Sequence, residues 1–495
     1  MKNENLNKES SENEPKPKDN LVTTKHKVTI NNKELKYTVT TGTVVLSCET
    51  TNQSDRKGEF EGEKPKAEIF YTAYIKDNVR NINKRPITFA FNGGPGSASV
   101  WLHMGMLGPK IVKLDDATYS KPPFELIDNE YSLLDKTDLV FIDPVGTGYS
   151  RPVEGEKAKD FHNLDKDIES LAFFIRLYLG RNERWLSPKF LAGESYGTTR
   201  SAGLAGYLQE KLGIYLNGLM LISSVLDFST LRFASNNDMP YALYFPSYVA
   251  TAYYYKKLSK NLLEMPLEEL LAEVKDFVAN EYVAALWLGS SLSKESRTEI
   301  INKLAHYSGL KKEYIDRTDL RIEIHKFCKE LLRDEGKTVG RLDSRFSGID
   351  KSGVTENFEF DPAMAAITGP YTAVFNDYIA KELKYQSDKP YEVLSYEVFG
   401  NWTWGKENQY VDVSETLRKA ISMNPHLKVH VTNGYFDLAT PFLATEYTFQ
   451  HMGLNTDLQE NVSMSYYDAG HMMYLHKPSL IKLKEKLGKF ISEAK

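Results

Sequence analysis

Short hydrophobic runs recur along most of the chain, each bounded by Gly, Pro, Asn or Asp. They lie at Ile87–Phe91, Leu139–Ile142, Phe190–Ala192, Leu219–Ser223, Val429–Thr432 and Ser465–Tyr467. Continuous apolar runs of this length are typical of strands that are buried on both faces. Between them, Asp165–Leu179 and Thr198–Leu212 carry apolar residues at helical spacing. The pattern therefore predicts an α/β fold with a mostly parallel central sheet flanked by helices.

The N-terminal residues follow a different pattern. Residues 1–25 are polar, carry charges of both signs and contain few aliphatic side chains, so we expect a disordered tail. From Lys27 onward, β-forming residues alternate over 28–30, 36–46 and 67–76, with a turn at 31–32. This alternation predicts antiparallel strands and hairpins at the start of the sheet.

Between about residues 230 and 395 the strand pattern stops and amphipathic helices are predicted. One begins at Pro266, and Glu295–His306 and Leu320–Leu332 indicate two more. Because core strands are predicted on both sides, we interpret this region as a helical cap inserted into the core. The predicted organisation is a tail at 1–25, an α/β core at 26–229 and 396–495, and a cap at 230–395.

Composition excludes several classes of protein. The chain has 62 Lys and Arg against 67 Asp and Glu, and the positive residues are interleaved with acids, so we expect no nucleic-acid partner. No stretch approaches the roughly 18 apolar residues of a membrane span. The N-terminal residues contain no apolar signal-peptide segment, so we expect a cytoplasmic protein. Cys48 and Cys328 are too few for a disulfide framework or a metal site and are interpreted as free thiols.

Gly193–Gly197 has the pattern Gly-x-Ser-x-Gly between a predicted strand and a predicted helix. A nucleophile elbow requires this context, because the glycines let the backbone turn sharply and hold the serine hydroxyl at the carboxyl end of the strand. The helix N-terminus adds a partial positive charge beside that hydroxyl. We therefore predict that Ser195 is a nucleophile, with an ordinary turn as the alternative.

A serine hydroxyl becomes a good nucleophile only when a histidine removes its proton, and a carboxylate orients that histidine. On this fold the expected chain order is Ser, then Asp or Glu, then His. His471 follows a predicted strand near the end of the chain, whereas His451 lies inside a predicted helix and His476 precedes one. We favour His471 and keep the other two as alternatives.

The candidate carboxylate lies after the predicted strand at 428–433. Asp437 follows this strand and is expected at the same sheet edge as Ser195. Asp468, in the same loop as His471, is the rival. No cluster of His, Cys or Asp has the spacing of metal ligands, so we expect neither a metal nor an organic cofactor.

A glycine-rich loop, Asn92-Gly93-Gly94-Pro95-Gly96-Ser97, follows the run Ile87–Phe91. Such a loop can present backbone N–H groups to a developing oxyanion. Phosphate binding is the competing interpretation, but the loop lacks both the Gly-Lys-Ser/Thr ending of a P-loop and the spacing of a dinucleotide fingerprint.

In combination these segments resemble the serine carboxypeptidases, peptidase family S10, of the α/β-hydrolase fold. The resemblance rests on Asn92–Gly96, Asp143–Ser150, Gly193–Gly197, Asp437 and Gly470-His471, which occur in the family's order. Together they are far more specific than any one alone. The predicted cap also lies where that family carries its insertion.

The resemblance implies a role for each candidate residue. Ser195 would be the nucleophile, His471 the general base and acid, and Asp437 its orienting carboxylate. The backbone N–H groups of Gly94 and Tyr196 would form the oxyanion hole, and Asn92, Gly93 and Glu194 would hold the free C-terminal carboxylate of a peptide substrate. A carboxyl group binds a carboxylate only when it is protonated, so we expect a raised Glu194 pKa or a preference for acidic pH.

Two positions depart from the family pattern. Ser97 stands where many members have a disulfide-bonded cysteine, and Met106 stands where well-known members have a second carboxyl group that partners Glu194. The expected activity is hydrolysis of C-terminal peptide bonds through an acyl-enzyme intermediate. The alternatives are an acyltransferase or esterase on the same scaffold, and a binding protein with a decayed site.

Overall fold

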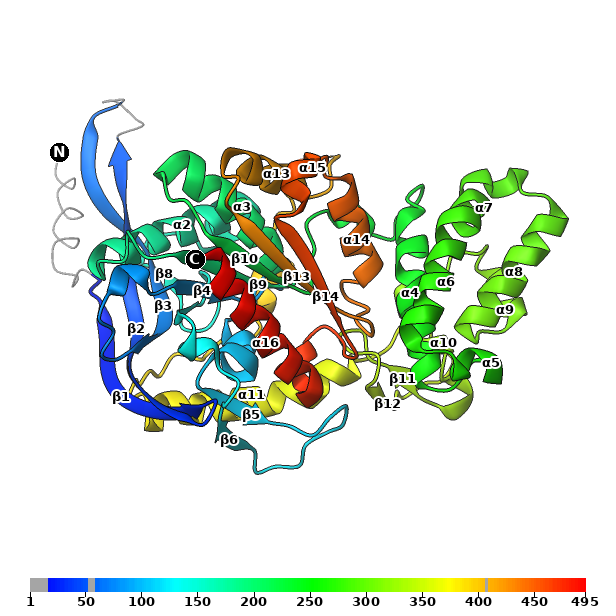
Figure 1. Ribbon diagram of the computed structural model, residues 1–495, viewed down its shortest axis with the longest axis horizontal. Helices are drawn as coiled ribbons and strands as arrows, with labels where there is room; N and C mark the ends of the chain where they lie inside the picture. The colour runs from blue at the N-terminus through cyan, green and yellow to red at the C-terminus, as the bar shows by residue number, and fades with distance from the viewer. Residues whose placement is uncertain (1–16, 52–57, 406–407) are drawn as a thin grey trace, which may run out of the picture.

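The computed structural model describes residues 17–51, 58–405 and 408–495 (Figure 1). Its strands are β1 Asn20–Ile30, β2 Lys33–Thr51, β3 Phe60–Lys76, β4 Ile87–Phe91, β5 Lys110–Lys113, β6 Glu125–Asp128, β7 Asp138–Ile142, β8 Arg151–Pro152, β9 Lys189–Glu194, β10 Gly218–Ile222, β11 Thr338–Val339, β12 Ser347–Gly348, β13 Lys428–Gly434 and β14 Val462–Tyr467. Its helices are α1 Val100–Leu102, α2 Leu164–Arg181, α3 Tyr196–Leu212, α4 Met239–Tyr254, α5 Lys260–Glu264, α6 Leu267–Phe277, α7 Val283–Leu288, α8 Lys294–Ser308, α9 Lys312–Arg317, α10 Ile324–Glu330, α11 Pro362–Lys381, α12 Tyr396–Gly400, α13 Ser414–Met423, α14 Phe442–His451, α15 Thr456–Gln459 and α16 Lys477–Ala494.

One large sheet organises the molecule, with the strand order β1-β2-β3-β7-β4-β9-β10-β13-β14 and β8 paired with β3. The strands from β7 to β14 in this order are parallel, and β1, β2 and β3 extend the sheet with antiparallel pairs. The parallel part explains the apolar runs, because side chains alternate between two covered faces. In β9, Phe190 and Ala192 pack with α11 and α16, while Leu191 packs with α2, α3 and α13.

The expectation of a disordered tail over residues 1–25 is contradicted in part. Residues 1–16 of the expected tail lie outside the described residues, but Asn20–Lys25 belong to β1, so the prediction of disorder is wrong there. β1 pairs with β2 along its whole length, from Asn20↔Thr43 to Ile30↔Lys33. A backbone ladder holds these polar residues at the sheet edge, where little side-chain burial is needed.

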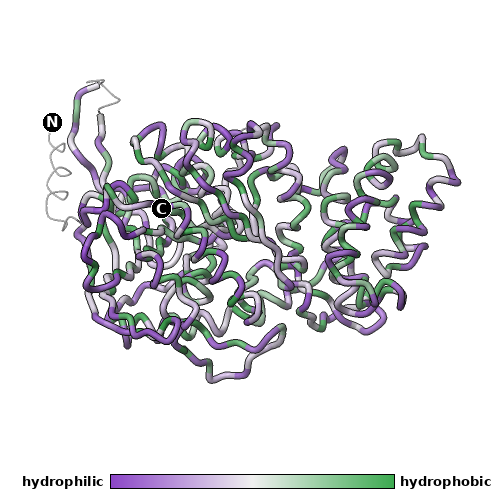
Figure 2. The backbone as a smooth tube through the Cα atoms, in the orientation of Figure 1, coloured by the Kyte–Doolittle hydropathy of each residue, from purple (hydrophilic) through white to green (hydrophobic). Residues whose placement is uncertain are grey.

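Helices α4 to α10 form a lobe at one end of the molecule (Figure 1). Their apolar side chains pack into a cluster of their own, which also receives Phe436 and Phe442 from the core. The hydropathy along the backbone shows the same division, with apolar stretches in the central strands and along the helices of the lobe (Figure 2). None of the described helices combines the length and apolar character of a membrane span.

α11 lies within the region 230–395 that we interpreted as the cap, yet it packs elsewhere. Its residues Tyr371 and Phe375 belong to the hydrophobic cluster on the core sheet. Helical periodicity predicts that a helix buries one face, but it does not identify the layer that the face will meet. The lobe therefore ends before α11.

A buried ion pair joins the two helices that flank the serine loop. Arg200 of α3 donates from Nε to Asp167 Oδ2 of α2 at 2.8 Å, and the Tyr196 hydroxyl donates to the same oxygen at 3.0 Å. Arg200 also donates to the carbonyl oxygen of Asn92. Both charged side chains are buried, so each depends on the other for compensation.

Asp167→Asn should therefore lower the free energy of unfolding by about 3–5 kcal/mol, because it leaves the Arg200 guanidinium buried beside a neutral group. Asp165→Asn, at an exposed site in the first turn of the same helix, is the matched control and should cost at most about 1 kcal/mol. Denaturant unfolding of both variants measures the difference. Equal losses would contradict the role given to the ion pair.

Candidate active site

Ser195 lies on the sharp turn between β9 and α3. Its backbone has φ 59° and ψ −130°, a conformation that residues with a side chain rarely adopt. Its N–H donates to the carbonyl of Ile222 at 3.0 Å, and Thr198 donates to its carbonyl from N–H at 2.8 Å and from Oγ1 at 2.7 Å. The turn is tight, since a Cβ on Gly193 would lie 2.1 Å from the carbonyl oxygen of Gly197.

His471 and Asp437 come from the loops after β14 and β13 and meet in the interior. His471 Nδ1 lies 2.8 Å from Asp437 Oδ2. The second oxygen, Oδ1, accepts from the N–H groups of Ala439 at 2.7 Å and Thr440 at 2.9 Å, and the Thr440 hydroxyl donates to Oδ2 at 2.7 Å. Asp437 is completely buried, and these contacts satisfy both of its oxygens.

The environment of His471 sets its protonation. Burial lowers the pKa of this imidazole, but the charge of Asp437 and the hydrogen bond to it raise the pKa, and the net shift is upward. The backbone holds the ring in place, because His471 N–H donates to the carbonyl of Leu342 at 2.6 Å and the His471 carbonyl accepts from the Ser223 hydroxyl at 2.6 Å. A fixed imidazole with a raised pKa is suited to accept a proton.

The alternative candidates Asp468, His451 and His476 take no part in this hydrogen-bonded pair. Asp468 is exposed. His451, at the end of α14, is also exposed and bonds the carbonyl of Tyr447 through Nδ1. His476 bonds the hydroxyl of Ser479 at the start of α16.

The loop Asn92–Gly94, after β4, packs closely against the first turn of α3. A Cβ on Gly93 would lie 2.5 Å from the backbone nitrogen of Tyr196, so only glycine fits there. Among the described residues we find no hydrogen-bond acceptor for the N–H groups of Gly94 and Tyr196. Both residues line the same cavity as Ser195 and His471, with a volume of about 660 Å³. This placement suits donors for an oxyanion.

Glu194 lies buried beneath this loop. Asn92 Nδ2 donates to Glu194 Oε1 at 2.9 Å, and Asn92 Oδ1 accepts from Leu102 N–H at 3.0 Å. Burial raises the pKa of Glu194 to about 7, although the nearby His471 and the donors Tyr474 and Asn92 act in the opposite direction. Near neutral pH the carboxyl is therefore partly protonated, as a partner for a carboxylate requires.

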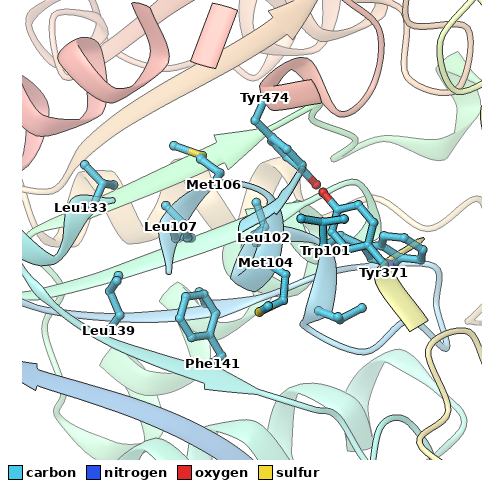
Figure 3. Close-up of a cluster of buried hydrophobic side chains, with 14 of the residues drawn as sticks. Trp101, Leu102, Met104, Met106, Leu107, Leu133, Leu139, Phe141, Tyr371 and Tyr474 are labelled. Carbon is cyan, nitrogen blue, oxygen red and sulfur yellow. The ribbon is translucent and has the colours of Figure 1, made fainter. Parts of the chain in front are cut away.

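Tyr371 and Tyr474 lie near Glu194 and beside Gly105, the residue that precedes Met106. Met106 is fully buried in the hydrophobic cluster on the sheet. The hydroxyl of Tyr474 faces Glu194, and the hydroxyls of Tyr474 and Tyr371 point toward each other (Figure 3). Of the two carboxyl oxygens, Oε1 accepts from Asn92, whereas Oε2 is buried without a hydrogen bond of good geometry to any of the described residues.

Sequence reasoning missed several residues that support the site. Thr440 bonds Asp437, Tyr474 faces Glu194, and Arg200 fixes the loop at Asn92. Of these, only Arg200 could have been noticed in the sequence. It is a charged residue about one turn after Tyr196, in a helix whose other buried residues are apolar, small or uncharged. Thr440 lies in a loop and Tyr474 in a single 3-10 turn, Met473–Leu475, and neither segment has a regular hydrophobic pattern.

The sequence was compared with known proteins and structures. A segment of 142 residues is 28% identical to serine carboxypeptidase-like 19 of Arabidopsis thaliana, covering 27% of this chain and 28% of that protein. A segment of 136 residues is 32% identical to the pheromone-processing carboxypeptidase KEX1 of Saccharomyces cerevisiae, covering 26% of this chain and 18% of that protein. These matches span less than a third of the length of either relative.

The crystal structure of Kex1(delta)p, a prohormone-processing carboxypeptidase from Saccharomyces cerevisiae, superimposes with a TM-score of 0.56 at 17% identity, over 92% of this chain and 91% of that one. The predicted α/β-hydrolase fold is thereby confirmed. The family model described as serine carboxypeptidase matches residues 59–478, a range that contains every motif discussed above. The chain therefore belongs to the serine carboxypeptidase family.

Proposed function

We propose that this protein is a serine carboxypeptidase that removes C-terminal residues from peptides. The observation that supports this most directly is a single cavity that joins two kinds of group. It contains Ser195 and the buried pair His471–Asp437, and it also contains Asn92 and Glu194, whose buried carboxyl has a pKa of about 7. The first set performs acyl transfer, and the second binds a free carboxylate.

In the proposed reaction, Ser195 Oγ attacks the carbonyl carbon of the last peptide bond while His471 takes the hydroxyl proton. The oxygen of the tetrahedral intermediate accepts from the N–H groups of Gly94 and Tyr196. When the C–N bond breaks, His471 gives its proton to the leaving amine and an ester of Ser195 remains. Water then attacks that ester with His471 again as base, releasing the shortened peptide and free Ser195.

Recognition of the C-terminus rests on the protonation of Glu194. Below its pKa of about 7 the carboxyl can donate a hydrogen bond to the substrate carboxylate, together with donors from Asn92 and Gly93. Above that pKa, two negative charges would face each other at hydrogen-bond distance. The Tyr474 hydroxyl contacts Glu194, and Met106 stands where the family pattern places a second carboxyl, so one titration governs recognition here.

Ser195→Ala should lower kcat for N-blocked dipeptides by at least about 10⁴-fold, because no other group forms the acyl-enzyme. It should also abolish covalent labelling by a fluorophosphonate, detected by mass spectrometry of the intact protein. Ser97→Ala, which removes another hydroxyl that lines the cavity, is the control and should retain labelling. Substantial turnover in Ser195→Ala would reject a serine hydrolase.

The pH dependence of kcat/KM should distinguish peptide acids from their amides. For acids we expect a bell-shaped profile, which rises as His471 loses its proton and falls as Glu194 ionises through about pH 7, tenfold per pH unit on the descending side. For the C-terminal amide of the same peptide, only the rise should be present. Glu194→Gln keeps a donor without a titratable charge, so it should remove the descending side for acids.

Glu323→Gln is the matched control for this test, since Glu323 lines the same cavity but caps α10 instead of bonding Asn92. It should retain the bell-shaped profile. An unchanged descending side in Glu194→Gln would show that Glu194 does not bind the substrate carboxylate. Equal rates for acid and amide at every pH would favour an esterase or acyltransferase instead.

We also expect peptidase activity to be unaffected by a chelator, because the proposed nucleophile, base and oxyanion donors are all groups of the protein itself. Hydrolysis of an N-blocked dipeptide before and after dialysis against EDTA tests this. Loss of activity that a divalent cation restores would contradict the proposed mechanism.

A further inference from the structure

Two arginines line the cavity that contains Ser195, and the mechanism uses neither. Arg232 lies between β10 and α4, just after the 3-10 turn Phe228–Thr230, and Arg341 lies between β11 and β12. Among the described residues, neither guanidinium donates a hydrogen bond or lies within ion-pair distance of a carboxylate. Each guanidinium carries five N–H donors, so the cavity wall presents a concentrated set of donors without protein acceptors.

The four arginines that the structure describes as buried are all paired, whereas Arg232 is exposed and Arg341 is half-buried. Arg85 and Arg184 donate to Asp138 at 2.8 and 2.6 Å, and Arg345 donates to Asp343 at 2.7 Å. Arg200 is paired with Asp167, as described above. Arg232 and Arg341 differ from these four in bordering the cavity, where water or a bound ligand can accept from them.

Contacts fix the position of the Arg232 side chain and of the Arg341 backbone at the cavity. The Arg232 guanidinium carbon lies 4.9 Å from the ring centroid of Trp404, and that ring packs edge-on against Tyr196, the neighbour of Ser195. The Arg341 carbonyl accepts from Leu438 N–H at 3.0 Å, next to Asp437. Both residues line the same cavity, and the charge of Arg341 acts on Arg232 and on His471, so the two cations lie near each other.

Two carboxylates also line the cavity, and backbone groups already engage both. Glu323 Oε2 accepts from the N–H groups of His325 and Lys326 at the start of α10. Asp361 accepts from Leu342 N–H at 3.0 Å and from Ala363 N–H at 2.9 Å. Helix N-termini compensate part of these negative charges. The charge of Arg341 also acts on Asp361, but among the described residues no guanidinium hydrogen bonds to either carboxylate.

The direction of the substrate follows from the proposed function, on which this inference rests. The free C-terminal carboxylate is placed at Asn92 and Glu194, on the side of Met106 and Tyr474. The remaining peptide then extends across Ser195 toward Tyr196, Phe228 and Trp404, which form a separate cluster. Arg232 lies over the rings of Phe228 and Trp404.

We propose that Arg232 and Arg341 select peptides with an acidic side chain on the acyl side of the scissile bond, within the last residues before it. A guanidinium matches the two oxygens of a carboxylate in a bidentate arrangement. The leaving C-terminal residue is not selected by these groups.

The test compares N-blocked tripeptides that end in Leu and carry Glu, Gln or Lys at either of the two preceding positions. At pH 6 the Glu peptide should have a kcat/KM about tenfold to a hundredfold above its Gln counterpart at one position, and Lys should be the poorest. Arg232→Gln and Arg341→Gln should each reduce the Glu-to-Gln ratio by about tenfold. The ratio is taken within each variant, so partial loss of folded protein cancels.

Arg176→Gln is the matched control, since Arg176 is an exposed arginine of α2 outside the cavity, and its loss changes the net charge equally. This variant should keep the ratio of the unmodified protein. A Glu-to-Gln ratio near one at both positions, or a preference that survives in both cavity variants, would overturn the proposal.

Binding to Ser195→Ala separates this inference from the proposed function. Calorimetric titration with the same peptides should show tighter binding of the Glu peptide, and this difference does not require turnover. If no peptide is hydrolysed but the Glu peptide still binds more tightly, the inference stands and the carboxypeptidase assignment fails. If peptides are hydrolysed and Glu and Gln peptides bind equally, the assignment stands and the inference fails.

Discussion

The close contact between the Asn92–Gly94 loop and the first turn of α3 is the constraint on which the rest of the site depends. Gly93 leaves no room for a side chain against the N–H of Tyr196, so the two backbones share one fixed geometry. Arg200 reinforces it by joining the Asn92 carbonyl to Asp167. The serine turn, the two free N–H groups and the Asn92–Glu194 pair are therefore positioned together, because each belongs to one of these two segments.

A second contact connects the catalytic pair to the region between the lobe and the core. The segment at 341–343 accepts from Leu438 N–H and from His471 N–H through consecutive carbonyls, and Asp343 packs directly beneath Gly470, where a Cβ would lie 2.4 Å from its Cα. The loops that carry Asp437 and His471 thus rest on the same short stretch that carries the Arg341 side chain. Arg341, which lines the cavity, and the two residues proposed to carry out the chemistry therefore share one backbone support.

The sequence allowed the core strands and the motif loops to be predicted for physical reasons. β4 coincides with the run Ile87–Phe91 because a strand covered on both faces has no polar position to interrupt its pattern. The loop at Asn92–Gly94 could be recognised because close backbone approach requires glycine. The first part of β1, Asn20–Lys25, was assigned to the tail because an edge strand needs few buried side chains. α11 was placed in the wrong layer because a hydrophobic face does not specify its partner. Arg232 and Arg341 are far apart in sequence, and only tertiary packing brings them into one cavity.

The two kinds of recognition proposed here respond differently to pH, and the difference follows from burial. Glu194 is enclosed, and its raised pKa of about 7 makes its affinity for the terminal carboxylate decay as the pH rises. The arginines border an open cavity and stay protonated throughout this range, so their attraction for an acidic side chain persists once that side chain has ionised. Raising the pH should then weaken binding of every peptide acid while preserving the preference among them. If one protonated carboxyl were the donor for both kinds of recognition, a single titration would control affinity and selectivity together, and the two could not separate with pH.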